Sequence, residues 1–336
     1  MKSRKIKSGM LPVLAMLVCL AACGLEKKDP KYIAPETQQA VQVTQQPEPV
    51  VEAWSYQAVA TDATNGLPKS VVSDYGVLID VEKEEILAAQ KPKERMNPAS
   101  MTKILTVLVA AEHVDMDQLE DTVTVSQEAT DYSYSNGCSN TGYEVDEQVT
   151  VQDLFYGTIL PSGADSAYTL AVYVAGSHEA FVDMMNEKLE EMGLSETTHF
   201  TNCVGLYDED HYSTVYDMAV IMKAASDNEF CRKVLSARTY VTTQTKEHKE
   251  GLTVSNWFLR RIEDKDTHGE VLCAKTGFVN QSGSCAASLA ADGTGKEYLC
   301  VTAGSTSSWR CIYDHVDIYD AFLPVVEPAD AETGTE

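Results

Sequence analysis

Apolar positions along this chain follow two spacings, and the change between them divides the folded part into three sections. Residues 75–81 are apolar and β-branched, and a charged turn at 82–85 separates them from a short apolar segment at 86–89. This pattern predicts a β-hairpin. The strand pattern returns near the other end of the chain in three segments, which are 270–279, 284–290 and 297–304. We therefore expect strands at both ends of the folded part.

The section between these strands is mainly helical. Asn97 and Pro98 are typical of a helix start, and residues 104–111 are apolar on nearly every face, which predicts a buried helix. Within residues 117–238, helical spacing recurs in the segments 151–160, 166–175, 179–192 and 215–225, and a last amphipathic helix is expected at 309–322. Strands on both sides of a helical block predict an α+β fold, with one sheet built from both ends of the chain and an all-helical subdomain inserted between them.

The first residues carry a targeting signal. Four basic residues precede an apolar run from Met10 to Leu20, which is typical of a secretory signal peptide and shorter than the ~20 residues that a spanning helix needs. The run ends in Ala21-Ala22-Cys23, which resembles a bacterial lipobox. This resemblance implies removal of residues 1–22 and a diacylglyceryl group on Cys23, whose two acyl chains anchor the protein to the cell membrane, outside the cytoplasm. Ordinary cleavage, with Cys23 as a chance residue, is the alternative.

Two segments have the composition of unfolded chain. Residues 23–62 are rich in Gln, Pro, Glu and Thr and show no period that buries a face, which predicts a flexible linker. Residues 326–336 are acidic and predict a disordered tail. The folded domain is then expected to span 63–325, which is long enough for one large domain or two closely packed subdomains.

The charge of the chain argues against nucleic acid as a partner. The 26 basic and 51 acidic residues give a net charge of −25, and removal of the four basic residues in 1–22 leaves 22 against 51, a net charge of −29. Phosphate binding needs clustered Lys and Arg, whereas this acidic balance is typical of a soluble secreted protein.

The cysteines do not indicate a metal site. Cys19 lies in the signal, and seven cysteines remain beyond Cys23: Cys138, Cys203, Cys231, Cys273, Cys285, Cys300 and Cys311. Some of these could pair outside the cytoplasm, but an odd number leaves at least one free or paired between chains. No Cys-x-x-Cys or His-Glu-x-x-His pattern occurs, so we expect no metal.

The first chemical motif is Ser100-Met101-Thr102-Lys103, at the start of the predicted buried helix. A spacing of three residues places the Ser100 hydroxyl and the Lys103 amine on one helical face. A serine hydroxyl needs a base to become a nucleophile, and burial beside a helix N-terminus lowers the pKa of a lysine enough for it to act as that base. Taken alone, the pattern occurs by chance in many chains of this length, and a solvated helix face is then the default interpretation.

Two further motifs follow. Lys275-Thr276-Gly277-Phe278 ends a predicted strand, where Lys and Thr can bind a carboxylate and Gly permits close backbone approach. Pro161-Ser162-Gly163-Ala164 enters a predicted helix, and Ser162 could relay a proton. Each motif also has a simpler interpretation: a turn with a surface lysine for the first, and a helix N-cap for Ser162.

Together the motifs resemble a known family. The chain has Ser-x-x-Lys, then Ser-Gly about 60 residues later, then Lys-Thr-Gly about 110 residues after that. This order and spacing resemble those of the low-molecular-mass penicillin-binding proteins, the serine D-Ala-D-Ala carboxypeptidases of the peptidase S11 family. The resemblance covers roughly residues 73–323. It implies the penicillin-recognising, β-lactamase/transpeptidase-like three-layer sandwich, with an antiparallel sheet between helices and the active site at the boundary with the helical subdomain.

The resemblance also implies roles for individual residues. Ser100 attacks the penultimate D-Ala carbonyl of a peptidoglycan stem pentapeptide, Lys103 takes the serine proton, and Ser162 assists proton transfer to the leaving D-Ala. The resulting acyl-enzyme is hydrolysed by water, no cofactor takes part, and β-lactams are covalent inhibitors.

The strand motif has binding roles in the same family. Lys275 and Thr276 hold the substrate carboxylate, and Gly277 lets the substrate approach the strand. The backbone N–H groups of Ser100 and Phe278 form the oxyanion hole, because a tetrahedral oxyanion needs two donors fixed in advance.

The chain departs from the family pattern at Ala164, where the family usually has asparagine. Alanine cannot hydrogen-bond the substrate amide or orient Lys103, and such a loss costs about 1–3 kcal/mol. Either another side chain substitutes, or turnover is reduced. The alternative function is therefore a surface lipoprotein that binds peptidoglycan or β-lactams with little turnover. The chain also ends soon after the catalytic domain, without the C-terminal module of many relatives.

Two other hydrolase classes fit less well. A class A β-lactamase shares the first and third motifs but also needs a Glu-x-x-Leu-Asn segment, which is absent between Ser162 and Lys275. A Ser-His-Asp hydrolase is disfavoured because the sequence has no Gly-x-Ser-x-Gly elbow. The sequence leaves open the balance of carboxypeptidase and transpeptidase activity, the cysteine pairing, a role in growth or sporulation, and the oligomeric state.

Overall fold

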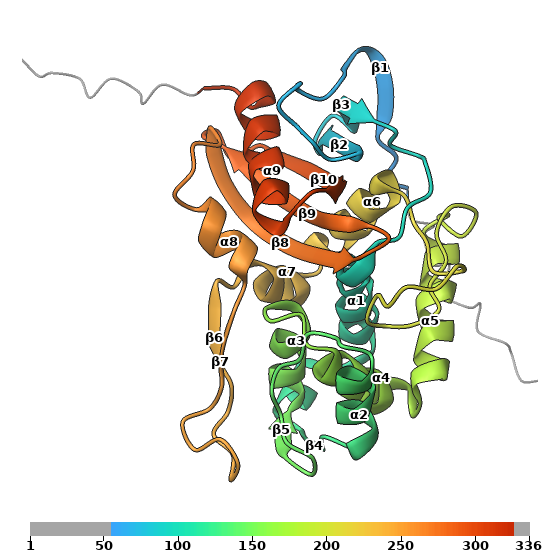
Figure 1. Cartoon of the computed structure of the whole chain (residues 1–336), viewed down its shortest axis with the longest axis vertical. Helices are drawn as coiled ribbons and strands as arrows, with labels where there is room; N and C mark the ends of the chain where they lie inside the picture. The colour runs from blue at the N-terminus through green and yellow to red at the C-terminus, as the bar shows by residue number, and fades with distance from the viewer. Residues whose placement is uncertain (1–54, 326–336) are drawn as a thin grey trace, which may run out of the picture. The chain divides into compact units, whose positions relative to one another are not determined.

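The structure, a computed structural model, describes residues 55–325 and is built around a six-stranded sheet (Figure 1). The order in the sheet is β1-β3-β2-β10-β9-β8. The bounds are β1 (Val59–Asn65), β2 (Tyr75–Asp80), β3 (Glu85–Gln90), β8 (Gly269–Val279), β9 (Gly283–Asp292) and β10 (Glu297–Ser305). All neighbours are antiparallel except β1 and β3. Because β2 pairs with β10, the two ends of the folded part share one sheet, as expected.

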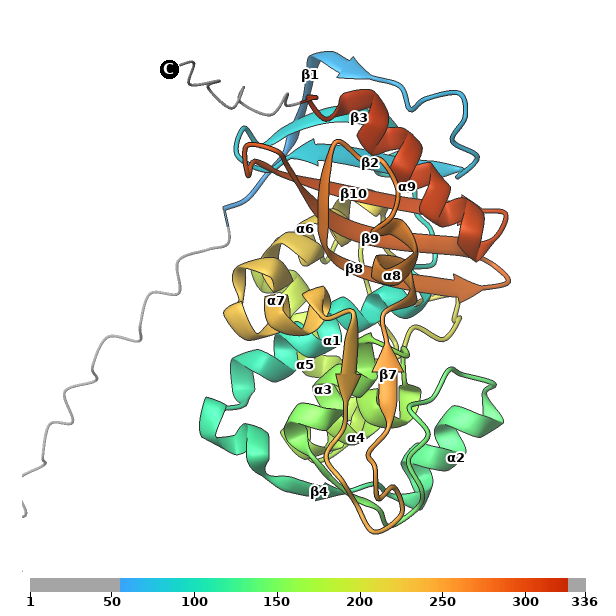
Figure 2. The same ribbon diagram turned by 90° about the vertical axis from the view of Figure 1, so that its left-hand side faces the viewer.

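Helices cover both faces of this sheet (Figure 2). The outer face is covered by α8 (Trp257–Ile262) and α9 (Ser308–Phe322). Against the inner face lie the 3₁₀ turn η1 (Ala99–Thr102), α6 (Val215–Asp227) and α7 (Glu229–Ser236), and α1 (Lys103–His113) continues from η1 into the helical part. This arrangement confirms the predicted α+β fold with a sheet between helices.

A helical subdomain lies below the inner layer (Figure 2). Its elements are η2 (Met116–Glu120), α2 (Gln127–Ser135), α3 (Val151–Ile159), α4 (Ala164–Ala175), α5 (His178–Glu191) and the small sheet of β4 (Thr122–Thr124) and β5 (Gln148–Thr150). A hairpin of β6 (Thr239–Val241) and β7 (Thr253–Ser255) extends beside it.

The alternation of side chains along the central strands explains the two helical layers. In β2, Val77 and Ile79 belong to the inner core, whereas Leu78 between them packs into the outer core with residues of α9 such as Ile318. All of these side chains are fully buried. Since successive residues of a strand point to opposite faces, a strand that is apolar at every position must be covered on both sides.

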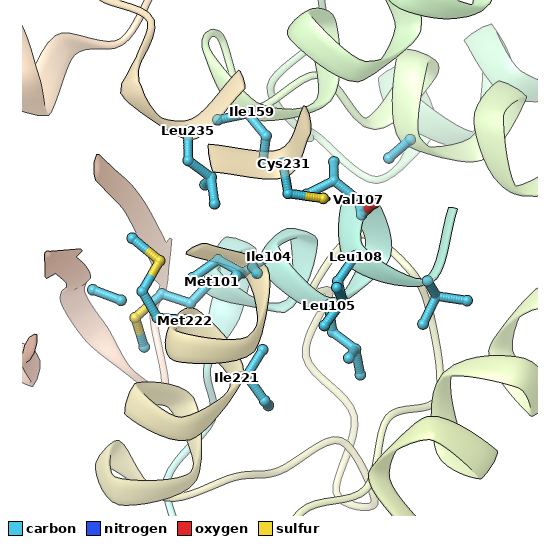
Figure 3. Close-up of a cluster of buried hydrophobic side chains, with 14 of the residues drawn as sticks. Met101, Ile104, Leu105, Val107, Leu108, Ile159, Ile221, Met222, Cys231 and Leu235 are labelled. Atoms are coloured by element: carbon cyan, nitrogen blue, oxygen red, sulfur yellow. Dashed lines mark hydrogen bonds between the residues drawn. The ribbon is translucent and has the colours of Figure 1, made fainter. Parts of the chain in front are cut away.

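Helix α1 passes through the centre of the inner core. Its apolar side chains and Met101 of η1 are almost completely buried, which confirms the prediction of a buried helix. Figure 3 shows Met101, Ile104, Leu105, Val107 and Leu108 against Ile221 and Met222 of α6, Cys231 and Leu235 of α7, and Ile159 of α3. The helix that follows Ser100 is therefore held on several sides, and the position of the serine is tied to the core.

The structure corrects one predicted boundary. The linker was expected to reach residue 62, but β1 begins at Val59, and the Val59 amide donates to the Glu84 carbonyl at 2.9 Å. Most side chains of β1 are exposed, so the strand is held by backbone pairing and has no apolar alternation that the sequence could reveal. Residues 1–54, with the expected signal and Cys23, and the tail 326–336 lie outside the described residues.

Several short elements were not predicted. They are α2, α7, α8, the small sheet of β4 and β5, and the β6–β7 hairpin. These elements are at most nine residues long, so the period of apolar residues gives little signal. The seven cysteines of residues 55–325 are all free, which removes the expectation that some of them pair. In this same range, no helix is long and apolar enough to cross a membrane.

A buried carboxylate fastens the loop before β2 to the outer layer. Asp314 of α9 is completely buried and accepts hydrogen bonds from the amides of Val72 (3.0 Å) and Ser73 (3.1 Å). The hydroxyls of Ser73 and Ser305 and the Arg310 side chain also donate to it, at 2.5, 3.0 and 2.9 Å. One side chain thus satisfies five donors from three segments.

Replacing this carboxylate is expected to destabilise the fold. Asp314→Ala leaves buried donors without a partner and should lower the free energy of unfolding by about 3 kcal/mol. Asp320→Ala in the same helix, where the carboxylate is exposed and contacts His268, should change it by less than about 1 kcal/mol. Urea denaturation compares the two variants, and an equal loss in both contradicts the role given to Asp314.

Candidate active site

The turn that carries Ser100 is strained and held by its neighbours. Ala99 has a φ of 46°, in the left-handed region that is unfavourable for a residue with a Cβ. The Asn97 side chain accepts from the Ala99 amide (2.9 Å) and donates to the His211 carbonyl (2.9 Å), while Thr102 contacts the His211 ring at 2.9 Å. Ser100 therefore lies in η1 rather than in the α-helix, which begins only at Lys103.

The Ser100 hydroxyl and the Lys103 amine are in contact. Lys103 Nζ lies 3.1 Å from Ser100 Oγ and donates to the Val204 carbonyl at 2.7 Å. The lysine side chain is almost completely buried, and burial lowers the pKa of its amine to about 8, against the opposing influence of Cys138, Cys203 and Asp165. About a tenth of the amine is thus neutral at pH 7 and able to accept a proton.

The loop 202–206 supplies the Val204 carbonyl and was missed by sequence reasoning. The Asn202 side-chain oxygen accepts from the amides of Val204, Gly205 and Leu206, at 3.2, 2.7 and 3.0 Å. Gly205 has a φ of 84°, and a Cβ there would collide with the carbonyl of Ala99. The only sequence signal is an Asn followed three residues later by a Gly, which is too common to identify a site.

Ser162 lies across from Ser100, on the other side of the cleft that these segments enclose, and its backbone is also strained. Its φ is 64°, and its hydroxyl accepts a hydrogen bond from Lys275 Nζ at 2.9 Å. The buried Asp165 holds the neighbouring loop, since its carboxylate accepts from the amides of Thr141 (2.8 Å) and Gly142 (3.2 Å). Ala164 is fully buried, and its amide donates to the Ser139 carbonyl at 2.8 Å.

Strand β8, the last strand in the sheet order, forms a further wall of the same cleft. A Cβ built on Gly277 would lie 2.9 Å from the Ser100 amide and 2.8 Å from Cys285 Sγ, so only glycine lets β8 approach η1. Phe278 is 64% exposed beside it. Lys275 is buried, and burial together with the charge of Lys103 lowers the pKa of its amine well below the usual range.

These segments enclose one open cleft of about 740 Å³. Ser100, Lys103, Ser162, Thr276, Gly277 and Phe278 line it, and Lys275 lies just below with its amine on Ser162. All seven predicted site residues within 55–325 are therefore brought together, although they come from three distant parts of the chain. The cleft also includes residues 136–139, which no sequence motif identified. Residues 55–325 contain no group of three or more His, Cys, Asp or Glu that could hold a metal ion.

Comparisons with known proteins agree with this geometry. A family model described as D-alanyl-D-alanine carboxypeptidase, peptidase S11, matches residues 60–306. The chain is 31% identical over 236 residues to the D-alanyl-D-alanine carboxypeptidase DacF of Bacillus subtilis. The match covers 70% of this chain and 58% of DacF, so the chain spans less than two thirds of that relative's length.

Two solved structures have the same fold. The Streptomyces K15 DD-transpeptidase superposes with a TM-score of 0.68 at 26% identity, covering 76% of this chain and 97% of that protein. Penicillin-binding protein 5 from Haemophilus influenzae superposes with a TM-score of 0.67 at 26% identity, covering 76% and 71% of the two chains.

The close approach of β8 to the serine can be tested at Gly277. Gly277→Ala places a methyl group against the Ser100 amide and should slow acylation of Ser100 by an activated ester by about 10²-fold or more, because the backbone donors at the serine are displaced. Gly66→Ala is the control, because its Cβ meets open space. Mass spectrometry of the adduct follows both rates, and a Gly277→Ala variant that reacts normally contradicts the model of the cleft.

Proposed function

The chain belongs to the D-alanyl-D-alanine carboxypeptidase family, peptidase S11, and from this premise we propose that it removes the terminal D-Ala from peptidoglycan stem pentapeptides through an acyl-enzyme on Ser100. The observation that carries the proposal is the contact of the Ser100 hydroxyl with a buried lysine whose pKa is about 8. A nucleophile and a partly neutral base lie together at the foot of an open cleft.

Acylation begins with proton transfer from Ser100 to the neutral amine of Lys103. The serine oxygen attacks the penultimate D-Ala carbonyl, and the C–O bond forms as the carbonyl oxygen gains the negative charge. The amides of Ser100 and Phe278 donate to that oxyanion, which is supported by the closeness of β8 to the Ser100 amide. Because these donors are part of the fixed backbone, they need no reorganisation during the reaction.

Release of D-Ala needs a proton on its nitrogen. The tetrahedral intermediate breaks its C–N bond as the nitrogen takes a proton from the Ser162 hydroxyl, and the proton that Lys103 accepted from Ser100 replaces it within the same cleft. The Lys275 amine donates a hydrogen bond to Ser162 and holds this hydroxyl in position. Lys275 and Thr276 also bind the terminal carboxylate of the substrate, and a carboxylate beside Lys275 restores the protonated form of that amine. Water enters after D-Ala leaves and hydrolyses the ester, with no cofactor.

Binding with little turnover is the second candidate, and Ala164 favours it. This residue is buried and offers no polar side-chain atom to the substrate amide. Residues 136–139 line the same cleft and include Asn136 and Ser139, whose side chains are polar. We favour turnover because Ser100, Lys103 and Ser162 all keep their contacts in spite of Ala164.

Location and inhibitors follow from the same proposal. The protein is held outside the cytoplasm, at the cell membrane, by a lipid on Cys23, and its substrate is the peptidoglycan stem peptide. β-Lactams acylate Ser100 because their strained amide takes the place of the D-Ala-D-Ala bond. Nucleic acid is not a partner, in keeping with the net charge of −25.

Release of D-Ala from a muramyl pentapeptide tests the proposed activity. Ser100→Ala should reduce release by at least about 10⁴-fold, because the attacking oxygen is lost. Ser236→Ala in α7, which removes an exposed hydroxyl, should leave release unchanged. A protein that releases no D-Ala but forms a stable penicillin adduct on Ser100 contradicts the carboxypeptidase and supports the binding function.

A further inference from the structure

An exposed group of aromatic and arginine side chains lies on the outer helical layer. It consists of Trp257, Arg260 and Arg261 in α8 and Trp309 and Tyr313 in α9, and we call it the aromatic–arginine patch. The two tryptophans are 56% and 47% exposed and Tyr313 is 40% exposed. The Arg261 guanidinium lies 4.4 Å from the centre of the Trp309 ring and 5.3 Å from that of Trp257. Arg261 thus links the two helices through their aromatic rings.

This patch presents positive charge on an acidic protein. The chain carries a net charge of −25, yet neither Arg260 nor Arg261 pairs with a carboxylate within residues 55–325. Two large indole rings so exposed are unusual for a soluble domain, since burying such a side chain contributes about 2–3 kcal/mol. A surface that combines exposed aromatic rings and unpaired positive charge suits a ligand with apolar faces and negative charge.

The start of α9 connects the patch to the wall of the cleft. Ser307 and Ser308 line the cleft, and Trp309 is the next residue in the chain. At the other tryptophan, Asn256 donates to the Ala274 carbonyl at 2.9 Å, which fixes the start of α8 to the edge strand β8, on the outer face of the sheet. Figure 2 shows α8 and α9 on the same face of the sheet, with α8 next to β8. A polymer whose stem peptide lies in the cleft can therefore reach both tryptophans.

We propose that the aromatic–arginine patch binds the glycan strand to which the stem peptide is attached, an inference that rests on the proposed function. Sugar rings present flat C–H faces that stack on the tryptophans, and free carboxylates of neighbouring stem peptides pair with Arg260 and Arg261. The patch then selects polymeric peptidoglycan over a free peptide, because only the polymer reaches the cleft and the patch together.

An anionic membrane surface has related chemistry, since Trp and Arg also gather at lipid headgroups. The position of the patch favours the polymer, because Trp309 follows directly on two residues of the cleft wall. The experiment therefore includes vesicles as a competing ligand.

Sedimentation with insoluble, purified peptidoglycan measures binding without the need for catalysis. The double variant Trp257→Ala/Trp309→Ala should bind about tenfold more weakly than the unaltered protein, because two aromatic contacts are lost. Arg260→Gln/Arg261→Gln should also weaken binding, and salt should weaken binding of the unaltered protein more than that of this variant. Met116→Ala and Lys233→Gln, two exposed residues outside the patch, are the matched controls and should bind normally.

Measuring D-Ala release distinguishes the role of the patch from the role of the cleft. The tryptophan double variant should lose about tenfold in release from the polymer at limiting concentration but none from a free pentapeptide. The proposal is overturned if the tryptophan double variant sediments with peptidoglycan as well as the unaltered protein does, or if it loses D-Ala release equally on both substrates. It is also overturned if the patch is needed for binding to phosphatidylglycerol vesicles but not for sedimentation with peptidoglycan. If the unaltered protein releases no D-Ala from either substrate, the proposed function fails, and sedimentation still decides whether the patch binds the polymer.

Discussion

Burial of the Lys103 amine is the constraint on which the rest of the site depends. A lysine removed from water in this way loses solvation of its charged form, so its pKa falls from 10.5 to about 8. Keeping such a group buried costs on the order of 3 kcal/mol of folding stability at neutral pH, and the cost shrinks as pH rises toward the pKa of the unfolded chain. Only a well-packed core sustains that cost, and α1 runs through the centre of one (Figure 3). The proposed role of Ser100 as nucleophile therefore depends on the stability of the domain.

Three segments far apart in sequence meet around the cleft that holds this amine. The loop 202–206 brings the Val204 carbonyl to it, the N-terminus of α4 brings Ser162 to the opposite wall, and β8 approaches the serine backbone at Gly277. Each approach depends on a local conformation that costs free energy by itself: positive φ at Ala99 and Ser162, or a glycine where a Cβ would collide. Of the six non-glycine residues with positive φ in residues 55–325, Ala99 and Ser162 are the two that lie at or beside the cleft hydroxyls.

The sequence allowed the sheet, the buried helix and the residues that meet at the cleft to be predicted, because each leaves a local pattern. Residues 75–81 and 270–279 show strand periodicity, and Ser100, Ser162 and Lys275 stand in short motifs. The rest is set by tertiary contacts. Strand β1 has exposed side chains and is held by backbone bonds to β3, so the linker boundary was placed too late. Asn202 and the cleft residues 136–139 gain their role only when folding brings them to Lys103, and no spacing along the chain reveals that.

The most direct test of this account is the pKa of Lys103, measured by NMR titration of its side-chain resonances, with Lys103→Arg to assign the signal. Activation by burial predicts a pKa near 8, so that about a tenth of the amine is neutral at pH 7, compared with about 1 in 3,000 for an ordinary lysine. A measured pKa above 10 contradicts the account, because Lys103 then remains charged throughout the physiological range and cannot serve as the base for Ser100.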